Sequence, residues 1–122
     1  MTVVLDASAV LAFLGDEAGG GVVERALDEG ARCSAVNWSE VAQKVSAAGG
    51  DWDVAAALLA SYGLAVEDAS AADGVEAARL WKRGSGLSLA DRFCLALGAR
   101  LGETVLTADS AWGSGEAVRQ IR

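Results

Sequence analysis

Four acidic residues in this sequence occupy positions from which their carboxylates could act together. Asp6 and Asp109 each follow a short apolar run, and Glu40 and Asp91 each lie near the start of a helical pattern. The chain contains no histidine. Carboxylates without His or Cys partners form the all-oxygen ligand set that suits Mg²⁺ or Mn²⁺ better than zinc. We therefore expect Asp6, Glu40, Asp91 and Asp109 to bind divalent cations, which would activate water for hydrolysis.

The absence of histidine also excludes whole classes of mechanism. A Ser-His-Asp or Cys-His nucleophile is impossible in this chain. The two cysteines, Cys33 and Cys94, lie far apart and form no CxxC motif, so they provide neither a disulfide framework nor a zinc site. We expect both to be buried, reduced thiols.

The elements that must position the four acids follow from the alternation of short apolar runs with longer helical patterns. We predict strands at 3–5, 32–36, 64–66 and 104–106, with 117–121 as a candidate fifth strand at an edge, and helices at 8–14, 20–29, 38–48, 53–62, 71–82 and 89–101. This alternation is typical of a parallel sheet covered on both faces. The predicted fold is a three-layer α/β/α domain spanning 1–122, with a central, mainly parallel sheet of four to five strands.

This fold would bring the four acids to one place. Asp6 and Asp109 leave the carboxyl-terminal edge of a parallel sheet, where ligands bind in open α/β folds. Helices between parallel strands run antiparallel to them, so the first turns that carry Glu40 and Asp91 lie at the same edge. Two carboxylates about 4 Å apart repel by on the order of 4 kcal/mol at an effective dielectric of about 20. Such a cluster needs cations.

Each acid also has a purely structural alternative. Asp6 and Asp109 could be helix N-caps, a role that Asp favours. The stretch from Asn37 to Glu40 fits a capping box, in which the third helical residue reaches back to the cap. Glu40 could instead pair with Lys44 one turn later.

Asp91 is the acid that is hardest to assign to capping alone. The stretch from Ser88 to Asp91 fits a capping box as well. Its neighbours between Phe93 and Leu97 are all apolar, however, and a buried carboxylate without a cation would be costly. Asp91 is therefore the preferred test of the metal hypothesis.

The overall charge limits the kind of partner. The chain carries 17 acidic and 10 basic residues, a net charge of −7, which argues against binding nucleic acid through a broad basic surface. It does not exclude a carboxylate metal centre, whose negative charge bound cations would offset. No apolar stretch approaches the ~20 residues of a membrane span. No basic region precedes the first apolar run, so we expect no secretory signal and a cytoplasmic protein.

Four segments together resemble the PIN domain, and within it the VapC-type toxins of bacterial toxin–antitoxin pairs. The segments are a hydrophobic strand that ends in Asp with a nearby hydroxyl, a helix that carries Glu, and two further acidic segments: 3–9, 37–41, 87–93 and 106–112. Each segment alone is a weak signal. Their order and spacing over nearly the whole chain are more specific.

The resemblance implies an endoribonuclease that uses Mg²⁺ or Mn²⁺, forms a homodimer and is inhibited by a cognate VapB-like antitoxin. The acidic residues of the family carry over onto Asp6, Glu40, Asp91 and Asp109. Some members have a further acid shortly after the last of these. Here none occurs before Glu116, which leaves open whether one or two metal ions would bind.

Other residues could support these roles. Ser8 and Thr107 could hold the carboxylates from behind or could simply cap turns. Arg92 could contact phosphate or form an exposed ion pair. Trp38, Trp52 and Trp81 are large side chains for a small domain and favour a homodimer interface, although they could also pack within the monomer.

Three alternative functions are weighed against a ribonuclease. A receiver-like regulatory domain would need an acidic pair after its first strand and a Lys after a late strand, but Asp6 stands alone and Lys44 and Lys82 both lie in helical patterns. A PIN-like module without catalysis would not need four acids. A nuclease for structured DNA would carry long basic insertions, and this chain has none.

Overall fold

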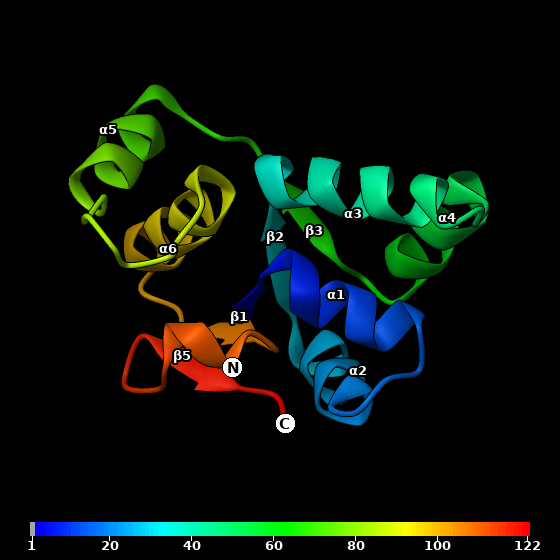
Figure 1. Cartoon of the computed structure of the whole chain (residues 1–122). Helices are drawn as coiled ribbons and strands as arrows, with labels where there is room; N and C mark the ends of the chain where they lie inside the picture. The colour runs from blue at the N-terminus through cyan, green and yellow to red at the C-terminus, as the bar shows by residue number, and fades with distance from the viewer. Residues whose placement is uncertain (1) are drawn as a thin grey trace.

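The computed structural model describes residues 2–122, and its central feature is one five-stranded sheet flanked by helices (Figure 1). Met1, which belongs to the expected domain span, lies outside the described residues. The elements in chain order are β1 (Val3–Leu5), α1 (Ala7–Leu14), α2 (Gly20–Glu29), β2 (Ala31–Ser34), α3 (Ala35–Ala47), α4 (Trp52–Ser61), β3 (Ala65–Glu67), α5 (Ala71–Arg79), α6 (Leu89–Leu101), β4 (Val105–Thr107), the 3₁₀ turn η1 (Ser110–Trp112) and β5 (Val118–Gln120).

The sheet has the strand order β3-β2-β1-β4-β5, and every neighbouring pair is parallel. The predicted α/β/α class is confirmed, and the candidate fifth strand pairs with β4 at an edge. A receiver-like domain would have the order 2-1-3-4-5, so that alternative is wrong. From β1 the chain continues to β2 on one side, while β4 joins on the other side. The carboxyl ends of β1 and β4 thus flank the switch point, where open α/β sheets bind ligands.

Successive residues of the central strand β1 face opposite sides of the sheet and enter two different cores. Leu5 packs in the core formed with α1 to α4, whereas Val4 packs in the core formed with α6. The larger core also contains fully buried side chains from four helices: Val10, Val23, Val41 and Leu59. The smaller core contains Cys94, Leu97 and Val105. Full burial of such aliphatic side chains stabilises the fold by about 1.5–3 kcal/mol each.

Helix α6 lies directly against the sheet because one position on it has no side chain. A Cβ atom at Gly98 would lie 2.7 Å from a methyl carbon of Val105 and 3.1 Å from the carbonyl oxygen of Glu103. Only glycine permits this approach. The close packing of α6 on β4 fixes the height at which the first turn of α6 meets the edge of the sheet.

Three predicted boundaries are wrong for local reasons. The second strand ends at Ser34 and not at residue 36, because the Ser34 hydroxyl accepts a hydrogen bond from the N–H of Val36 and caps α3. Helix α3 therefore starts three residues before the predicted start at residue 38. Helix α5 ends at Arg79 and not at residue 82, because the N–H of Trp81 turns back to the carbonyl oxygen of Ala78. Within residues 2–122, no helix has the length and apolar character needed to cross a bilayer.

Candidate active site

Asp6 is the buried centre of the site. It follows β1 in extended conformation, and its side chain is only 3% exposed. One carboxylate oxygen accepts hydrogen bonds from the N–H of Ala9 at 2.8 Å and from the Ser8 hydroxyl at 2.7 Å. The other accepts a 2.5 Å hydrogen bond from the Thr107 hydroxyl. Asp6 is thus an N-cap of α1, as the capping alternative anticipated, and its second oxygen faces the neighbouring strand.

The Asp6 carboxylate is desolvated, and its pKa lies above the ordinary value. Burial raises this pKa above its ordinary value, although the hydrogen bonds from Thr107, Ser8 and Ala9 lower it. The negative charge of Asp91 raises it further. A carboxylate that is desolvated and next to another acid is the situation that a bound cation would relieve.

Two hydroxyl groups join the carboxyl ends of β1 and β4. The Thr107 oxygen, besides donating to Asp6, accepts a hydrogen bond from the N–H of Asp109 at 3.0 Å. The Ser8 oxygen accepts one from the N–H of Ala108 at 2.9 Å. Ser8 and Thr107 therefore fill both of the roles considered for them, holding a carboxylate and capping a turn. The hydroxyls hold the Asp6 carboxylate and also fix the turn that leads to Asp109.

Asp109 lies at the rim of the site and is exposed. One of its carboxylate oxygens accepts the N–H of Ala111 at 2.9 Å and so caps η1. Its backbone carbonyl accepts a 2.8 Å hydrogen bond from the side chain of Gln120 on β5. The second carboxylate oxygen of Asp109 accepts no hydrogen bond from residues 2–122.

Asp91 forms the capping box that was its structural alternative. Its carboxylate accepts the N–H of Ser88 at 2.9 Å, and the Ser88 hydroxyl accepts the N–H of Asp91 at 3.0 Å. Asp91 is partly exposed, so the argument from its apolar neighbours was wrong, and Asp6 is the buried carboxylate instead. The charge of Asp91 nevertheless acts on Asp6, and one oxygen of the Asp91 carboxylate accepts no hydrogen bond in the described chain.

Glu40 reaches the site from the second turn of α3, since that helix starts at Ala35. The expected capping box with Asn37 as cap is therefore wrong, and no ion pair joins Glu40 to Lys44 within residues 2–122. Asn37 holds Glu40 in a different way. Its side-chain amide donates to the Glu40 carboxylate at 2.9 Å and to the carbonyl oxygen of Ala90 at 3.2 Å.

Asn37 is a site residue that sequence reasoning missed. It is fully buried, and it links Glu40 on α3 to the first turn of α6 beside Asp91. Its own side-chain oxygen is buried and has no hydrogen-bond partner in the described chain. The available signal was its spacing of three residues from Glu40, which places both side chains on one side of a helix.

The four acids therefore lie around one edge, but they do not form a closed ligand shell. Across residues 2–122, no three acidic or cysteine side chains are arranged to hold one metal ion. The donor set fits Mg²⁺ or Mn²⁺, because it consists of carboxylates and one orphaned amide oxygen and contains no imidazole. Capping occupies one oxygen each of Asp91 and Asp109, and the amide of Asn37 occupies one of Glu40.

The cysteines are buried and free, as expected. Burial raises the pKa of Cys33 to about 12, and the charges of Asp6 and Glu40 add to this effect. Burial also raises the pKa of Cys94. Arg92 forms no ion pair within residues 2–122; one of its guanidinium N–H groups donates to the carbonyl oxygen of Ala77 at 2.9 Å and so joins α6 to α5. A contact between Arg92 and phosphate stays a prediction. The two thiols are thus structural.

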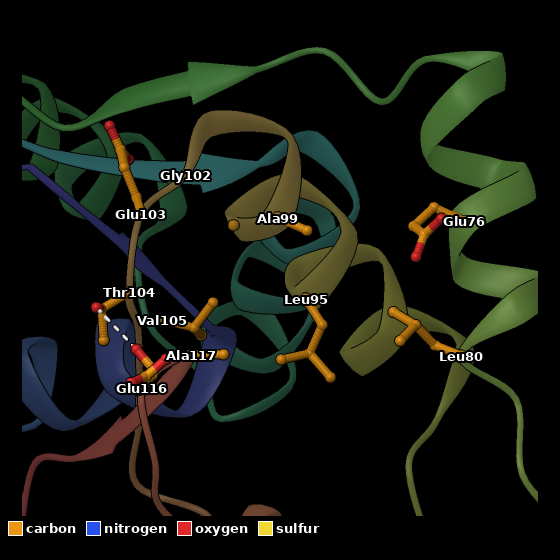
Figure 2. A pocket seen from close by; sticks show the side chains of 11 residues that line it. Glu76, Leu80, Leu95, Ala99, Gly102, Glu103, Thr104, Val105, Glu116 and Ala117 are labelled. Carbon is orange, nitrogen blue, oxygen red and sulfur yellow. Dashed lines mark hydrogen bonds between the residues drawn. The ribbon is translucent and has the colours of Figure 1, made fainter.

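A separate groove lies between α5, α6 and β4 and is lined mainly by apolar groups (Figure 2). Its lining includes Leu80, Leu95 and Val105, with Glu76 and Glu116 among its polar members. None of the four predicted site residues borders it. The candidate active site is therefore the open edge of the sheet and not this groove.

Comparisons with known proteins agree with this architecture. The family model of the PIN domain matches residues 3–114. No curated protein matches the sequence at a significant level. A toxin–antitoxin complex from Klebsiella pneumoniae is similar in structure, with a TM-score of 0.77 and 15% identity over 98% of each chain. VapC20 of Mycobacterium tuberculosis, described as a sarcin-ricin loop cleaving toxin, has a TM-score of 0.69 and 22% identity over 93% of this chain and 97% of that one.

A third solved structure extends the comparison. VapBC2 from Rickettsia felis, bound to a DNA fragment from its promoter, has a TM-score of 0.71 and 14% identity over 98% of each chain. At such low sequence identities, the structural similarity shows only that the fold is shared. The match to the family model over most of the chain shows the family.

Proposed function

The chain belongs to the PIN domain family, and from that premise we propose that it is an Mg²⁺- or Mn²⁺-dependent endoribonuclease, the toxin of a type II toxin–antitoxin pair. One observation carries the proposal. A buried carboxylate with a raised pKa, Asp6, lies at the switch point of a parallel sheet, and the charge of Asp91 acts on it. The proposed nuclease domain is the whole span 1–122, acting on RNA in the cytoplasm.

The residues proposed to hold the cation are Asp6, Glu40, Asp91 and Asp109. A divalent cation bound there would lower the pKa of a coordinated water and offset charge on the scissile phosphate. The chain itself provides orientation. Ser8 and Thr107 hold the two oxygens of Asp6, and Asn37 holds Glu40 toward the first turn of α6. Such outer contacts fix the angle at which ligand oxygens meet an ion.

A specific observation favours a second candidate, a PIN-like module that binds a partner without catalysis. Asp6, Asp91 and Asp109 all cap helices or turns, so their presence does not by itself require a metal. Capping explains one oxygen of each residue. It does not explain why a buried acid, Asp6, has its second oxygen held by the Thr107 hydroxyl beside the turn that leads to Asp109, and we prefer the enzyme for this reason.

We further propose that the protein forms a homodimer and binds a VapB-like antitoxin. Support comes from structural relatives that are described as toxin–antitoxin complexes and from exposed apolar side chains. Val54 and Leu58 on α4 are 64% and 43% exposed and border a groove between α1, α3 and α4. Sedimentation of the purified chain at micromolar concentration tests the dimer, and a monomer there would contradict it.

The test of the proposed activity is a digest of total RNA by the purified protein in Mg²⁺, in Mn²⁺ and in a chelator, with the cut sites mapped by sequencing. The proposal predicts discrete cuts that require metal and disappear in Asp6→Asn. An RNA population left intact by well-folded protein in both metals would support the silent binding module instead. Cuts that survive in Asp6→Asn would indicate a contaminating nuclease.

A further inference from the structure

The loop between α5 and α6 carries an unusual group of exposed side chains. Trp81, Lys82 and Arg83 are consecutive and exposed, and Trp81 is 56% exposed. The Arg83 guanidinium lies over the Trp81 ring, 5.7 Å from its centroid. We call residues 81–86 the basic loop. The other three tryptophans of the chain are partly buried, so the exposure of Trp81 calls for an explanation.

The basic loop lies at the same end of the molecule as the acids. Helices α5 and α6 are antiparallel, because Asp73 at the start of α5 pairs with Arg100 at the end of α6. Toward the other end of this helix pair, Leu80 at the end of α5 lies across the groove from Leu95 of α6 (Figure 2). The C-terminal end of α5 is therefore next to the N-terminal end of α6, which carries Asp91.

The segment 79–92, which contains the basic loop, has a net positive charge, whereas the whole chain has a net negative charge. Residues 79–92 contain four of the 10 basic residues and one of the 17 acidic residues. Four arginines elsewhere or at the border of this region pair with carboxylates: Arg32, Arg79, Arg100 and Arg122. Within residues 2–122, neither Lys82 nor Arg83 forms such a pair. Unpaired positive charge beside an acidic centre suits a polyanion whose backbone passes the site.

The backbone of the loop presents these side chains to solvent. Gly84 and Gly86 have φ angles of +78° and +76°, the left-handed region that glycine adopts without strain. Nothing lies within 4 Å of where a Cβ would stand at either position. The Ser85 hydroxyl accepts the N–H of Leu87 and shapes the turn into α6. No other part of the described chain covers the loop at its glycines.

We propose that the basic loop binds single-stranded RNA next to the site, with Trp81 stacking on a base and Lys82 and Arg83 contacting phosphates. An exposed aromatic ring combined with adjacent cations is how proteins hold single strands without reading their sequence. The inference rests on the proposed function, since it places RNA at the acidic edge. It adds the residues that would hold the strand on the α5–α6 side of Asp91.

The test measures the binding of a fluorescein-labelled 12-nucleotide oligouridine by anisotropy, in Mg²⁺ and at several salt concentrations. The full chain is used with Asp91→Asn as background so that the strand stays intact. The test variants are Trp81→Ala and the double variant Lys82→Gln/Arg83→Gln. The matched control is the double variant Arg25→Gln/Arg119→Gln. It removes the same amount of positive charge at two exposed arginines that have no carboxylate partner in the described chain.

The inference predicts that each loop variant weakens binding by roughly 10-fold or more, since stacking of one base and contact to two phosphates are each lost. The slope of log K against log salt should fall by about 1.4 in the double variant, at ~0.7 for each phosphate of a single strand. That slope should stay unchanged in Trp81→Ala. Trp81→Phe should restore most of the affinity.

Three results would overturn the inference. The first is a loop variant that binds as tightly as the control variant. The second is an absence of RNA binding by every variant. The third is full RNA affinity combined with lost co-purification of a co-expressed antitoxin, which would make the loop a protein contact. Failure of the proposed function is read separately, from the digest of total RNA by the unmodified chain, because the binding assay needs no cleavage.

Discussion

The Thr107 hydroxyl donates a 2.5 Å hydrogen bond to the Asp6 carboxylate, and this contact joins the ends of two neighbouring strands that are 101 residues apart in sequence. The same oxygen accepts the backbone N–H of Asp109. One buried hydroxyl therefore sets the distance between two of the proposed metal ligands. The position of each acid depends on the other through Thr107.

Replacing Thr107 by Val keeps its shape and removes this link. Asp6 loses a donor and the N–H of Asp109 loses an acceptor, so we expect a loss of about 1–3 kcal/mol in the free energy of unfolding. The pKa of Asp6 should rise further, because the hydrogen bond from Thr107 lowers it. Chemical denaturation measures the first effect. Thr104→Val, which removes a solvent-exposed hydrogen bond from the Thr104 hydroxyl to the carbonyl oxygen of Glu116, away from Asp6, is the control and should cost less.

Asp6→Asn tests how the buried charge affects stability as a function of pH. The folded pKa of Asp6 lies above its ordinary value of 3.8, so folding favours the protonated acid. The stability that this provides is complete below pH 3.8 and is lost as pH rises through the raised pKa. At neutral pH, metal-free Asp6→Asn should be at least as stable as the wild-type protein.

The comparison is made by melting both proteins without metal from about pH 4 to pH 7. The difference in stability between wild type and Asp6→Asn should shrink toward acid pH. Asn can still accept the N–H of Ala9, and the Thr107 hydroxyl can turn to accept its amide. A variant that is destabilised at every pH would show that the charge of Asp6 supports the fold instead of opposing it.

Asp91 and Ser88 form a matched pair that separates capping from catalysis. Asn at position 91 retains an oxygen that can accept the N–H of Ser88, so Asp91→Asn should cost about 1 kcal/mol or less. Ser88→Ala removes the other half of the box and should cost about 0.5–2 kcal/mol. If Asp91 is a ligand, RNA cleavage should fall at least ~100-fold in Asp91→Asn and stay near wild type in Ser88→Ala.

Both variants are assayed for melting and for RNA cleavage in the same preparation. Ser70→Ala, in the corresponding capping box of α5, shows what the loss of a cap costs away from the site. Full activity in Asp91→Asn would assign this residue to capping alone and would support the silent module.

The buried Asn37 connects the two helices that carry Glu40 and Asp91. Asn37→Ala removes both hydrogen bonds of its amide and should cost about 1–3 kcal/mol. Because Glu40 loses its orientation, affinity for Mn²⁺ should fall about 10- to 100-fold. Calorimetric titration measures this, with the exposed Gln43→Ala on the same helix as control. Unchanged Mn²⁺ affinity would remove Asn37 from the site.

The alternation of apolar runs and helical patterns was sufficient to predict the sheet and the edge to which the acids belong. The order of the acids along the chain then placed Asp6 and Asp109 at the ends of strands. These sequence patterns could not predict the local environment of each acid. The residues from Phe93 to Leu97 are apolar, but they point to different sides of α6, while the Asp91 side chain turns back over the N-terminal end of the helix.

The environments of Asn37 and of the tryptophans also depended on three-dimensional packing. The start of α3 depended on the Ser34 cap, and only the correct start shows that Asn37 is buried. Trp38 and Trp52 were expected at a dimer interface or within the monomer; their rings contact each other edge to face at 4.8 Å against the core of one chain, and the interface stays a prediction. Trp81 has the same residue type and is exposed. Residue type alone does not distinguish these outcomes.

Metal binding by the free protein tests the central claim, that Asp6, Glu40, Asp91 and Asp109 form one shared site. The measurement is a titration with Mn²⁺ and Mg²⁺, followed by calorimetry and by the melting temperature, on the wild type and Asp6→Asn. The claim predicts saturable binding that stabilises the wild type by about 2.7 kcal/mol at 100 times Kd, and a loss of this effect in Asp6→Asn. A melting temperature that does not change in millimolar metal, with no heat of binding, would contradict it.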